Sequence, residues 1–366
     1  MEKSKLNNWV KFLFPKIFII KKGFYNKKPD NKHNNPTIPF LGATAFNNGI
    51  STFYNIKDID EASKVGYGKN EDLNRKIFEG KSIVVTNNGS VGHSYYQHIP
   101  YTCSHDINPL YLKGRKLNVF LGSFIITCIE QQKVCFEYAR KWRPKRMIKS
   151  NILLPTQADR MPDYEYMESY SKKIFQQKQD EYLAYIQNRV TQLANTPKPI
   201  ALEEKEWEVF KTTTIFDMIQ RGKRLKKDDH IMGEVPYASS TSLNNGIDDF
   251  IGNEIGVRLF DNCLTLANSG SVGCTFYQPF KVIASDHVTM LQNKTFNKYV
   301  YLFMASMLTR LSEKYSFNRE INDTRLSKEK IMLPITAEGS PDYEYMEQYM
   351  KYQEYQKLKD YLEFKK

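Results

Sequence analysis

The residue types that could support acid–base or nucleophilic catalysis come together at two places in the chain. Residues 104–106 read Ser-His-Asp and residues 285–287 read Ser-Asp-His. A catalytic triad needs three converging side chains, whereas adjacent residues of a strand point to opposite faces. The sequence therefore predicts that both triplets are hydrogen-bonding residues of a loop or a strand end.

Two further patterns point to chemistry but lack essential parts. Cys103 lies near His105, but the five cysteines form no CxxC pair, so neither a zinc site nor a disulfide framework is indicated. Residues 108–111 (Asn-Pro-Leu-Tyr) are close to the Asn/Asp-Pro-Pro-Tyr/Phe motif of adenine amino-methyltransferases. They lack its second proline, and no glycine-rich cofactor loop precedes them. We predict a chain with no catalytic residue, no metal and no cofactor of its own, in the reducing cytoplasm.

Other motifs of the chain occur twice. Asn-Asn-Gly-Ser-Val-Gly at 87–92 returns as Asn-Ser-Gly-Ser-Val-Gly at 268–273, and Pro-Asp-Tyr-Glu-Tyr-Met-Glu at 162–168 returns unchanged at 341–347. The hexapeptide lacks the Lys-Ser/Thr ending and the spacing of a phosphate-binding P-loop. It is interpreted as a tight turn whose glycines supply positive φ.

The distance between copies identifies the repeated unit as a whole domain. The offset falls from 198 residues, between Trp9 and Trp207, to 179 residues, between Met167 and Met346. Solenoid units are roughly 20–50 residues long, so this period means two copies of one domain. The apolar run 12–20 could pass for a signal peptide, but its surroundings have internal counterparts, which predicts that it belongs to the fold.

The composition narrows the classes of partner that the chain is expected to bind. The net charge of +12 favours a polyanion such as nucleic acid, although an AT-rich genome also enriches any protein in Lys, Asn, Ile and Tyr. No apolar run approaches the roughly 18 residues of a membrane span, so we expect no membrane association.

Each copy is predicted to be a mixed α/β domain that is largely sheet. Residues 82–86 and 264–267 are typical of buried strands leading into the glycine turns, and longer apolar stretches at 118–139 and 298–312 predict helices. The predicted fold class is α/β (mixed α+β), with two pseudo-symmetric globular domains separated by a pair of long antiparallel coiled-coil helices. The predicted boundaries are 1–161 for the first domain, 162–196 for the first helix, 197–340 for the second domain and 341–366 for the second helix.

The duplicated heptapeptide is typical of a helix N-terminus, where proline and acidic residues are favourable. Apolar residues then follow three or four apart, which predicts one apolar stripe on each helix. Each stripe either packs against the other helix or against its own domain; the identical helix starts favour mutual packing. The stripe residues predicted to bind a partner are Met167, Tyr170, Ile174, Met346, Tyr349 and Met350.

The polar and basic residues shared by both copies are candidates for contacting nucleic acid. Basic side chains neutralise phosphates, and Asn, Ser and Arg in neighbouring loops can contact base edges. A solvated charged face is the alternative for any one of them. The predicted contacts are Lys21, Lys22, Asn87, Asn88, Ser90, His93, Arg140, Lys145, Arg146 and Lys149 in the first copy, and Arg221, Lys223, Arg224, Asn268, Ser269, Ser271, Arg319, Arg325 and Lys328 in the second.

Two modules, each followed by a helix and sharing one turn motif, resemble the specificity subunits of type I restriction–modification systems and of related type IIB-like systems. The resemblance rests on the hexapeptides 87–92 and 268–273, on Val-Pro-Tyr at 235–237, on the run 325–334 and on the duplicated heptapeptide. It extends from about Trp9 to the C-terminus. It implies two target-recognition domains, each reading one half of a split double-stranded DNA sequence, and helices that set the spacing.

The resemblance also implies partners. The helices would dock adenine-methyltransferase subunits, which hold S-adenosylmethionine, and a restriction (nuclease/translocase) subunit with ATP and Mg belongs to some of these systems. Two alternatives remain open: the recognition portion of a combined methyltransferase–nuclease, and a coiled-coil scaffold without DNA readout. The second helix, which ends at Lys366, is expected to be shorter than the first, and the divergent loops predict two different half-sites.

Overall fold

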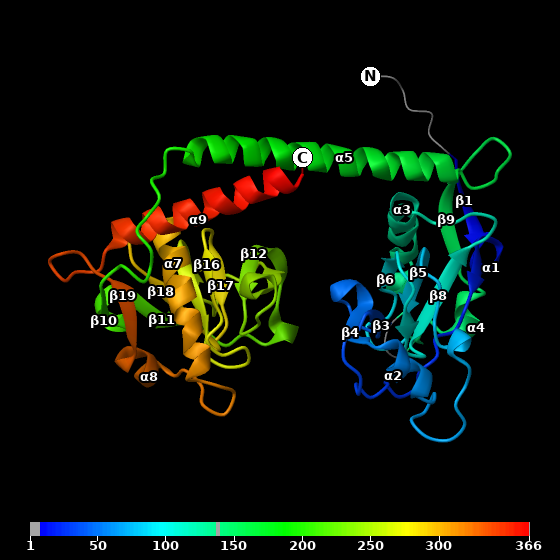
Figure 1. Ribbon diagram of the computed structural model, residues 1–366, viewed down its shortest axis with the longest axis horizontal. Helices are drawn as coiled ribbons and strands as arrows, with labels where there is room; N and C mark the ends of the chain where they lie inside the picture. The colour runs from blue at the N-terminus through cyan, green and yellow to red at the C-terminus, as the bar shows by residue number, and fades with distance from the viewer. Residues whose placement is uncertain (1–7, 137–139, 366) are drawn as a thin grey trace. The chain divides into compact units, whose positions relative to one another are not determined.

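The computed structural model describes residues 8–136 and 140–365, which divide into two compact units, Met1–Glu181 and Tyr182–Lys366 (Figure 1). The boundary falls within the long helix α5 (Tyr164–Leu193), so each unit contains part of it. Both units combine small, mostly antiparallel sheets with a few helices, which confirms the mixed α/β class.

The first unit is built on a four-stranded antiparallel sheet in the order β2-β8-β5-β6. Its strands are β2 (Phe18–Ile20), β8 (Ile107–Leu112), β5 (Ser82–Thr86) and β6 (Ser94–Gln97). The β5 strand is buried along its whole length, as the sequence predicts. A cluster of buried apolar residues joins this sheet to helix α3 (Val119–Glu130).

Two smaller sheets complete the first unit. The strands β1 (Asn8–Leu13) and β9 (Asn151–Thr156) pair antiparallel, and β4 (Ile50–Tyr54), β3 (Ile38–Leu41) and β7 (Thr102–Cys103) form the other sheet. The short helices are α1 (Phe14–Ile17), α2 (Ile56–Glu61) and α4 (Pro144–Met147). The segment 8–20 thus contributes β1, α1 and β2, which confirms that it is part of the domain.

The second unit repeats this topology. Its central sheet has the order β11-β18-β15-β16, formed by β11 (Met218–Arg221), β18 (Val288–Gln292), β15 (Cys263–Ala267) and β16 (Thr275–Gln278). The remaining strands are β10 (Trp207–Lys211), β19 (Lys330–Pro334), β12 (Met232–Ala238), β13 (Ile247–Ile251), β14 (Leu259–Phe260) and β17 (Val282–Ala284). The helices are α6 (Thr212–Ile215), α7 (Lys298–Thr309), α8 (Asp323–Lys328) and α9 (Tyr343–Phe364).

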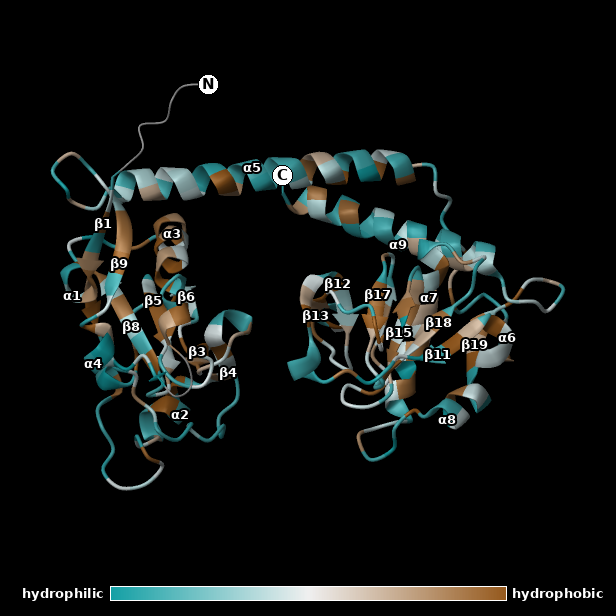
Figure 2. Cartoon of the chain, turned by 180° about the vertical axis from the view of Figure 1, so that it is seen from behind, coloured by the Kyte–Doolittle hydropathy of each residue, from teal (hydrophilic) through white to brown (hydrophobic). Residues whose placement is uncertain are grey.

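Hydropathy differs between the central sheets and the short surface helix α4. The central strands are predominantly hydrophobic, whereas α4 is hydrophilic (Figure 2). The predicted helix 118–139 is too long: α3 ends at Glu130, a 3₁₀ turn follows, and residues 137–139 lie outside the described part of the chain. The predicted helix 298–312 corresponds to α7 followed by a 3₁₀ turn at Arg310–Glu313.

The long helices pack chiefly against their own domains at their first turns. Met167 of α5 and Met346 of α9 are both fully buried in the cores of their units. Within the second unit, the end of α5 runs antiparallel to α9. Arg189 Nε lies 2.8 Å from Glu354 Oε1, and the rings of Tyr182 and Tyr361 are 5.6 Å apart. The α9 helix has 22 residues and α5 has 30, so the second helix is shorter, as expected.

Candidate nucleic-acid interface

Each central sheet carries a glycine turn between a middle strand and an edge strand, β5 and β6 in the first unit and β15 and β16 in the second. Gly89, Gly92, Gly270 and Gly273 all have positive φ, as the sequence predicts. The second glycine of each turn also lies against a helix end: a Cβ on Gly92 would come within 2.8 Å of Lys133 Cγ, and one on Gly273 within 2.6 Å of a backbone nitrogen. Only glycine fits these two positions without rearrangement.

The asparagine before each glycine turn is a structural clamp. Asn87 donates from Nδ2 to Asn108 Oδ1 at 2.9 Å, and its backbone carbonyl accepts from the Trp142 N–H at 3.1 Å. Asn108 in turn donates from Nδ2 to the Trp142 carbonyl at 3.0 Å. Asn87 is only 2% exposed. Burial therefore contradicts the prediction that Asn87 contacts nucleic acid, because its amide is used to hold the segment beginning at Trp142.

The second unit contains the same clamp. Asn268 Nδ2 donates to the Ile321 carbonyl at 2.5 Å and to Thr289 Oγ1 at 2.9 Å, while the Ile321 N–H donates to the Asn268 carbonyl at 3.0 Å. Asn268 is 1% exposed, so it too is removed from the predicted contacts. In both units the clamp fixes the start of a segment that carries basic residues. Asn108, the first residue of the methyltransferase-like tetrapeptide, is accounted for by this structural role.

The clamped segment of the first unit is strongly basic. Residues 140–149 contain six Lys or Arg residues and no Asp or Glu. The segment borders a cavity of about 660 Å³ that is also lined by Lys22 and His105 (Figure 1 shows its helix, α4). Trp142, which is fully buried, anchors it by stacking on Phe136 with ring centroids 4.5 Å apart. The fold therefore gathers positive charge around a hollow, which is the arrangement that attracts phosphates.

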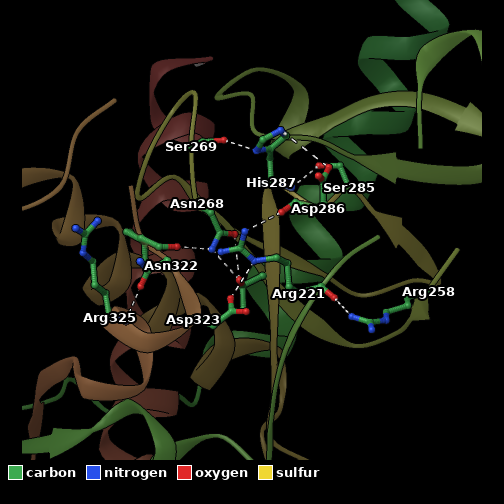
Figure 3. Close-up of polar contacts among 12 residues, drawn as sticks. Arg221, Arg258, Asn268, Ser269, Ser285, Asp286, His287, Asn322, Asp323 and Arg325 are labelled. Atoms are coloured by element: carbon green, nitrogen blue, oxygen red, sulfur yellow. Dashed lines mark hydrogen bonds and ion pairs between the residues drawn. The ribbon is translucent and has the colours of Figure 1, made fainter. Parts of the chain in front are cut away.

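The equivalent segment of the second unit is partly neutralised. Residues 319–328 contain Glu320 and Asp323 beside their three basic residues. Arg221 Nε lies 2.9 Å from Asp323 Oδ1, and Arg221 also donates to the Asp286 carbonyl at 3.3 Å (Figure 3). Arg325 donates to the Glu320 carbonyl at 2.6 Å. These contacts orient two of the predicted basic residues but reduce the charge that they present.

Most of the other predicted contacts are accessible, with two exceptions. Ser269 is buried, and its Oγ lies 2.7 Å from His287 Nδ1. His93 is half-buried, and burial together with the neighbouring Lys133 lowers its pKa, so it does not supply positive charge at neutral pH. Ser90 and Ser271 are half-buried residues of the glycine turns. The exposed residues of the set are Lys21, Lys22, Arg140, Lys145, Arg146, Lys149, Lys223, Arg224, Arg319, Arg325 and Lys328, and Arg221 is partly exposed.

Four residues beside the predicted set belong to the same surfaces. Lys141, Arg143 and His105 line the basic cavity of the first unit, and Arg258 donates to the Arg221 carbonyl at 2.6 Å in the second. The prediction favoured residues shared by both copies. Lys141, Arg143 and Arg258 lack an equivalent of the same type, so only the density of charge in residues 140–149 could have revealed the first two.

The helix residues predicted to bind a partner fall into two groups. Met167 and Met346 are fully buried within their own domains, so they do not offer a free surface, which corrects that part of the prediction. Tyr170 and Ile174 are exposed, whereas Tyr349 and Met350 are half-buried against the core of the second unit.

Tyr170 and Ile174 line an apolar groove between α3 and the first half of α5. Its volume is about 750 Å³. Phe124 lies at the centre of its aromatic lining, with its ring centroid 6.1 Å from that of Trp9 and 5.9 Å from that of Tyr170.

The described residues do not form a cluster of metal ligands. Within 8–136 and 140–365, no group of three His, Cys, Asp or Glu side chains is placed to hold a metal ion. Cys103 is fully buried, which raises the pKa of its thiol well above the usual range. Among the helices that the structure describes, none is both long and apolar enough to span a membrane.

Comparison with known proteins identifies the family. The model of the type I restriction modification DNA specificity domain matches residues 7–183 and again 204–362, so the chain belongs to this family of restriction–modification specificity subunits. The family is one of recognition subunits, and the chain is a non-catalytic DNA-specificity subunit. The duplication seen in the sequence therefore corresponds to two copies of the specificity domain.

Two specificity subunits that resemble the chain in sequence agree with this assignment, and a structural match is reported beside them. The specificity subunit S.BcgI of a type II restriction enzyme from Heyndrickxia coagulans is 32% identical over 277 residues, covering 75% of this chain and 78% of that protein. A Mycoplasma pneumoniae protein described as a type I specificity subunit, S.MpnORF507P, is 22% identical over 313 residues, covering 83% and 78%. A solved S subunit from M. genitalium aligns over 99% of this chain and 93% of its own, with 14% identity and a TM-score of 0.46.

Proposed function

We propose that the two units are target-recognition domains, each of which binds one half of a bipartite double-stranded DNA sequence. The observation that carries this proposal is the duplicated clamp: one framework, used twice, holds two basic segments that differ in sequence. A shared framework would give both domains the same orientation toward a groove, while different exposed side chains would read different bases. The predicted divisions 1–161, 162–196, 197–340 and 341–366 follow this scheme.

The exposed basic residues would supply most of the affinity. Contacts from Lys and Arg to phosphates release counterions, so binding weakens as salt rises. The cavity bordered by residues 140–149 makes the first domain the stronger electrostatic site. In the second domain, Arg319, Arg325 and Lys328 are the exposed basic residues of the clamped segment, and the pairing of Arg221 with Asp323 predicts fewer free phosphate contacts.

We further propose that α5 docks an adenine-methyltransferase subunit. The aromatic trio Trp9, Phe124 and Tyr170 has an equivalent in Trp207, Phe303 and Tyr349, with the same neighbouring contacts. The second trio is shielded: the Trp207 indole N–H donates to the Leu202 carbonyl at 3.0 Å, and Leu202 packs on the core there.

Trp9 and Tyr170, by contrast, are 47% and 48% exposed in the first unit. The equivalent apolar surface in the second unit is covered, whereas this one is exposed. An exposed apolar surface of this kind is suited to binding a protein partner. S-adenosylmethionine, and ATP and Mg where a restriction subunit takes part, would bind to the partners. The complex would act in the cytoplasm, where it meets cellular DNA.

Methylation-sensitive sequencing of host DNA, with and without this gene and its neighbours, tests the proposal. Loss of N6-methyladenine from a gapped, two-part motif is the expected result. Selection of bound duplexes from a random pool by the chain in complex with its neighbour's product is the second test. Enrichment of a single continuous motif, or of none, would contradict the proposal of two domains that each read a half-site.

A further inference from the structure

A second pair of polar side chains lies beside each clamp and differs between the two domains. In the first domain, Asn88 Nδ2 donates to Asp106 Oδ1 at 3.0 Å. In the second, Ser269 Oγ and His287 Nδ1 lie 2.7 Å apart (Figure 3). Both pairs join a glycine turn to the turn that precedes the next sheet strand, and they occupy equivalent positions 181 residues apart.

The neighbouring residues are exchanged as well. His105 and Asp106 of the first domain correspond to Asp286 and His287 of the second, so the order of the imidazole and the carboxylate is reversed. The buried clamp keeps Asn at both equivalent positions, Asn87 and Asn268. Since either outer pair makes the same structural connection, the fold does not require this difference in chemistry.

The outer pairs lie next to positive charge, and their members are half-buried or exposed except Ser269, which is buried. His105 lines the basic cavity of about 660 Å³, and His105 and Asp106 together line an adjoining cavity of about 360 Å³. In the second domain, the His287 side chain is 54% exposed and the Asp286 carbonyl accepts from Arg221. Each pair therefore has basic residues beside it, and each has a member that solvent reaches, Asp106 or His287. Asp106 Oδ1 also lies 3.3 Å from His105 Nε2.

We propose that these outer pairs are base-reading positions that make the two half-sites different. The inference rests on the proposed function and adds the residues that determine specificity. Asp106 is an acceptor, and it matches the exocyclic amino group of cytosine or adenine in the major groove. Ser269 occupies His287 Nδ1, and Nε2, which lies 4.0 Å from Asp286 Oδ1, would donate to the acceptors N7 or O6 of a purine. The reversed pair therefore recognises bases of opposite hydrogen-bonding character.

Reciprocal exchange of the pairs tests this inference in the full chain with its methyltransferase partner. One variant carries Asn88→Ser with Asp106→His, and the other carries Ser269→Asn with His287→Asp. Each is used to select duplexes from a random pool, in parallel with the unaltered chain. We expect each exchange to change the preferred base at one position of one half-site, by about 10-fold or more, and to leave the other half-site unchanged.

Two conservative variants keep the test independent of folding. Asp106→Asn retains an acceptor for Asn88, and His287→Gln retains polar reach, so both should fold and bind with an unchanged salt dependence while discriminating less at the same positions. Unchanged half-sites in all four variants, with DNA binding intact, would overturn the inference. Failure of the unaltered chain to select any two-part motif would instead reject the proposed function, so the two failures are distinguishable.

Discussion

The two domains share an interior and differ in the charge that this interior positions. In both, a buried asparagine (Asn87 or Asn268) fixes the backbone where the basic segment begins. The first domain then presents six cationic residues without an acidic neighbour in the segment, whereas the second ties Arg221 to Asp323. The buried asparagine holds the segment in place, and we expect the affinity for DNA to depend on other, exposed residues, so that affinity could differ between domains of the same geometry.

The basic segments are anchored to different extents. Trp142 stacks on Phe136, contacts Phe14 and donates from Nε1 to Ser150 Oγ at 2.9 Å. Ile321 is equally buried at the equivalent position but is a smaller side chain. The more highly charged segment is therefore held by the larger anchor. Its like charges repel one another, and burial of the indole offsets that cost.

Removal of this anchor should have the largest effect. Trp142→Ala is expected to destabilise the first domain by about 3–5 kcal/mol, because it removes a fully buried aromatic side chain. Chemical denaturation followed by fluorescence and circular dichroism measures the change. Val134→Ala, at a side chain that is 86% exposed, is the matched control and should be nearly neutral. An effect below about 1 kcal/mol would mean that Trp142 does not anchor the segment.

Charge reversal in the basic segments should have the next largest effect, and it should weaken DNA binding more in the first domain than in the second. Arg143→Glu with Lys145→Glu is expected to raise the Kd for target DNA on the order of 100-fold and to flatten its salt dependence by about two charges. Arg319→Glu with Arg325→Glu should weaken binding less, because Arg325 is already engaged by the Glu320 carbonyl. Fluorescence anisotropy at several salt concentrations measures both effects. Equal losses in the two domains would contradict the proposed asymmetry.

The second domain also offers a variant that should act in the opposite direction. Asp323→Asn removes the carboxylate paired with Arg221 and is expected to tighten DNA binding by a few-fold. The same anisotropy titration provides the measurement. Weaker binding in this variant would show that the ion pair orients Arg221 for DNA rather than restraining its charge.

The clamps should be of similar importance in the two domains. Asn87→Ala and Asn268→Ala are each expected to cost about 1–3 kcal/mol, because buried hydrogen-bond partners lose their donor. Urea denaturation of each variant gives the free energy of unfolding. Asn88→Ala, which removes only the outer pair, is the control and should cost less. A loss of unfolding free energy in only one of the two variants would contradict the equivalence of the two interiors.

Lowering the pH should destabilise the first domain through the buried carboxylate of Asp58. Burial raises the pKa of Asp58, but hydrogen bonds from the His33 ring and from the backbone N–H groups of Lys32, Asn55 and His33 outweigh it and lower the pKa overall. The carboxylate therefore adds stability above its unfolded pKa of about 4, and this stability is lost as the pH falls through the lower folded value. Stability curves between neutral and acidic pH, compared with those of Asp58→Asn, should show this loss in the unaltered chain only.

Several features were predictable because they depend on local residue order. Glycine in the turns at 87–92 and 268–273, the buried strands and the helix starts all follow from rules that act over a few residues. The predicted helix at 118–139 was too long: α3 ends at Glu130, where the polar residues Gln131, Gln132 and Lys133 interrupt the apolar run and the chain turns. The apolar side chain of Val134 beyond this point is 86% exposed, so it does not extend the buried face of the helix.

The candidate site was predictable in its charge but not in its assignment of roles. Asn87 and Asn268 recur because they are needed in the interior, and recurrence by itself did not distinguish a buried amide from one that meets DNA. The order of residues is enough to show two copies of one domain, a glycine turn and a basic segment in each copy, and catalytic motifs that are incomplete. These properties are written in residue types and spacing.

Which polar residues face inward and which face solvent depends on the folded chain. Contacts between residues far apart in the sequence, such as Arg221 with Asp323 and Asn268 with Ile321, set the free charge and the fixed backbone of the site. Such contacts depend on how the strands return to the same edge of the sheet. The free energy of a buried amide or an ion pair depends on that neighbourhood, and sequence spacing does not contain it.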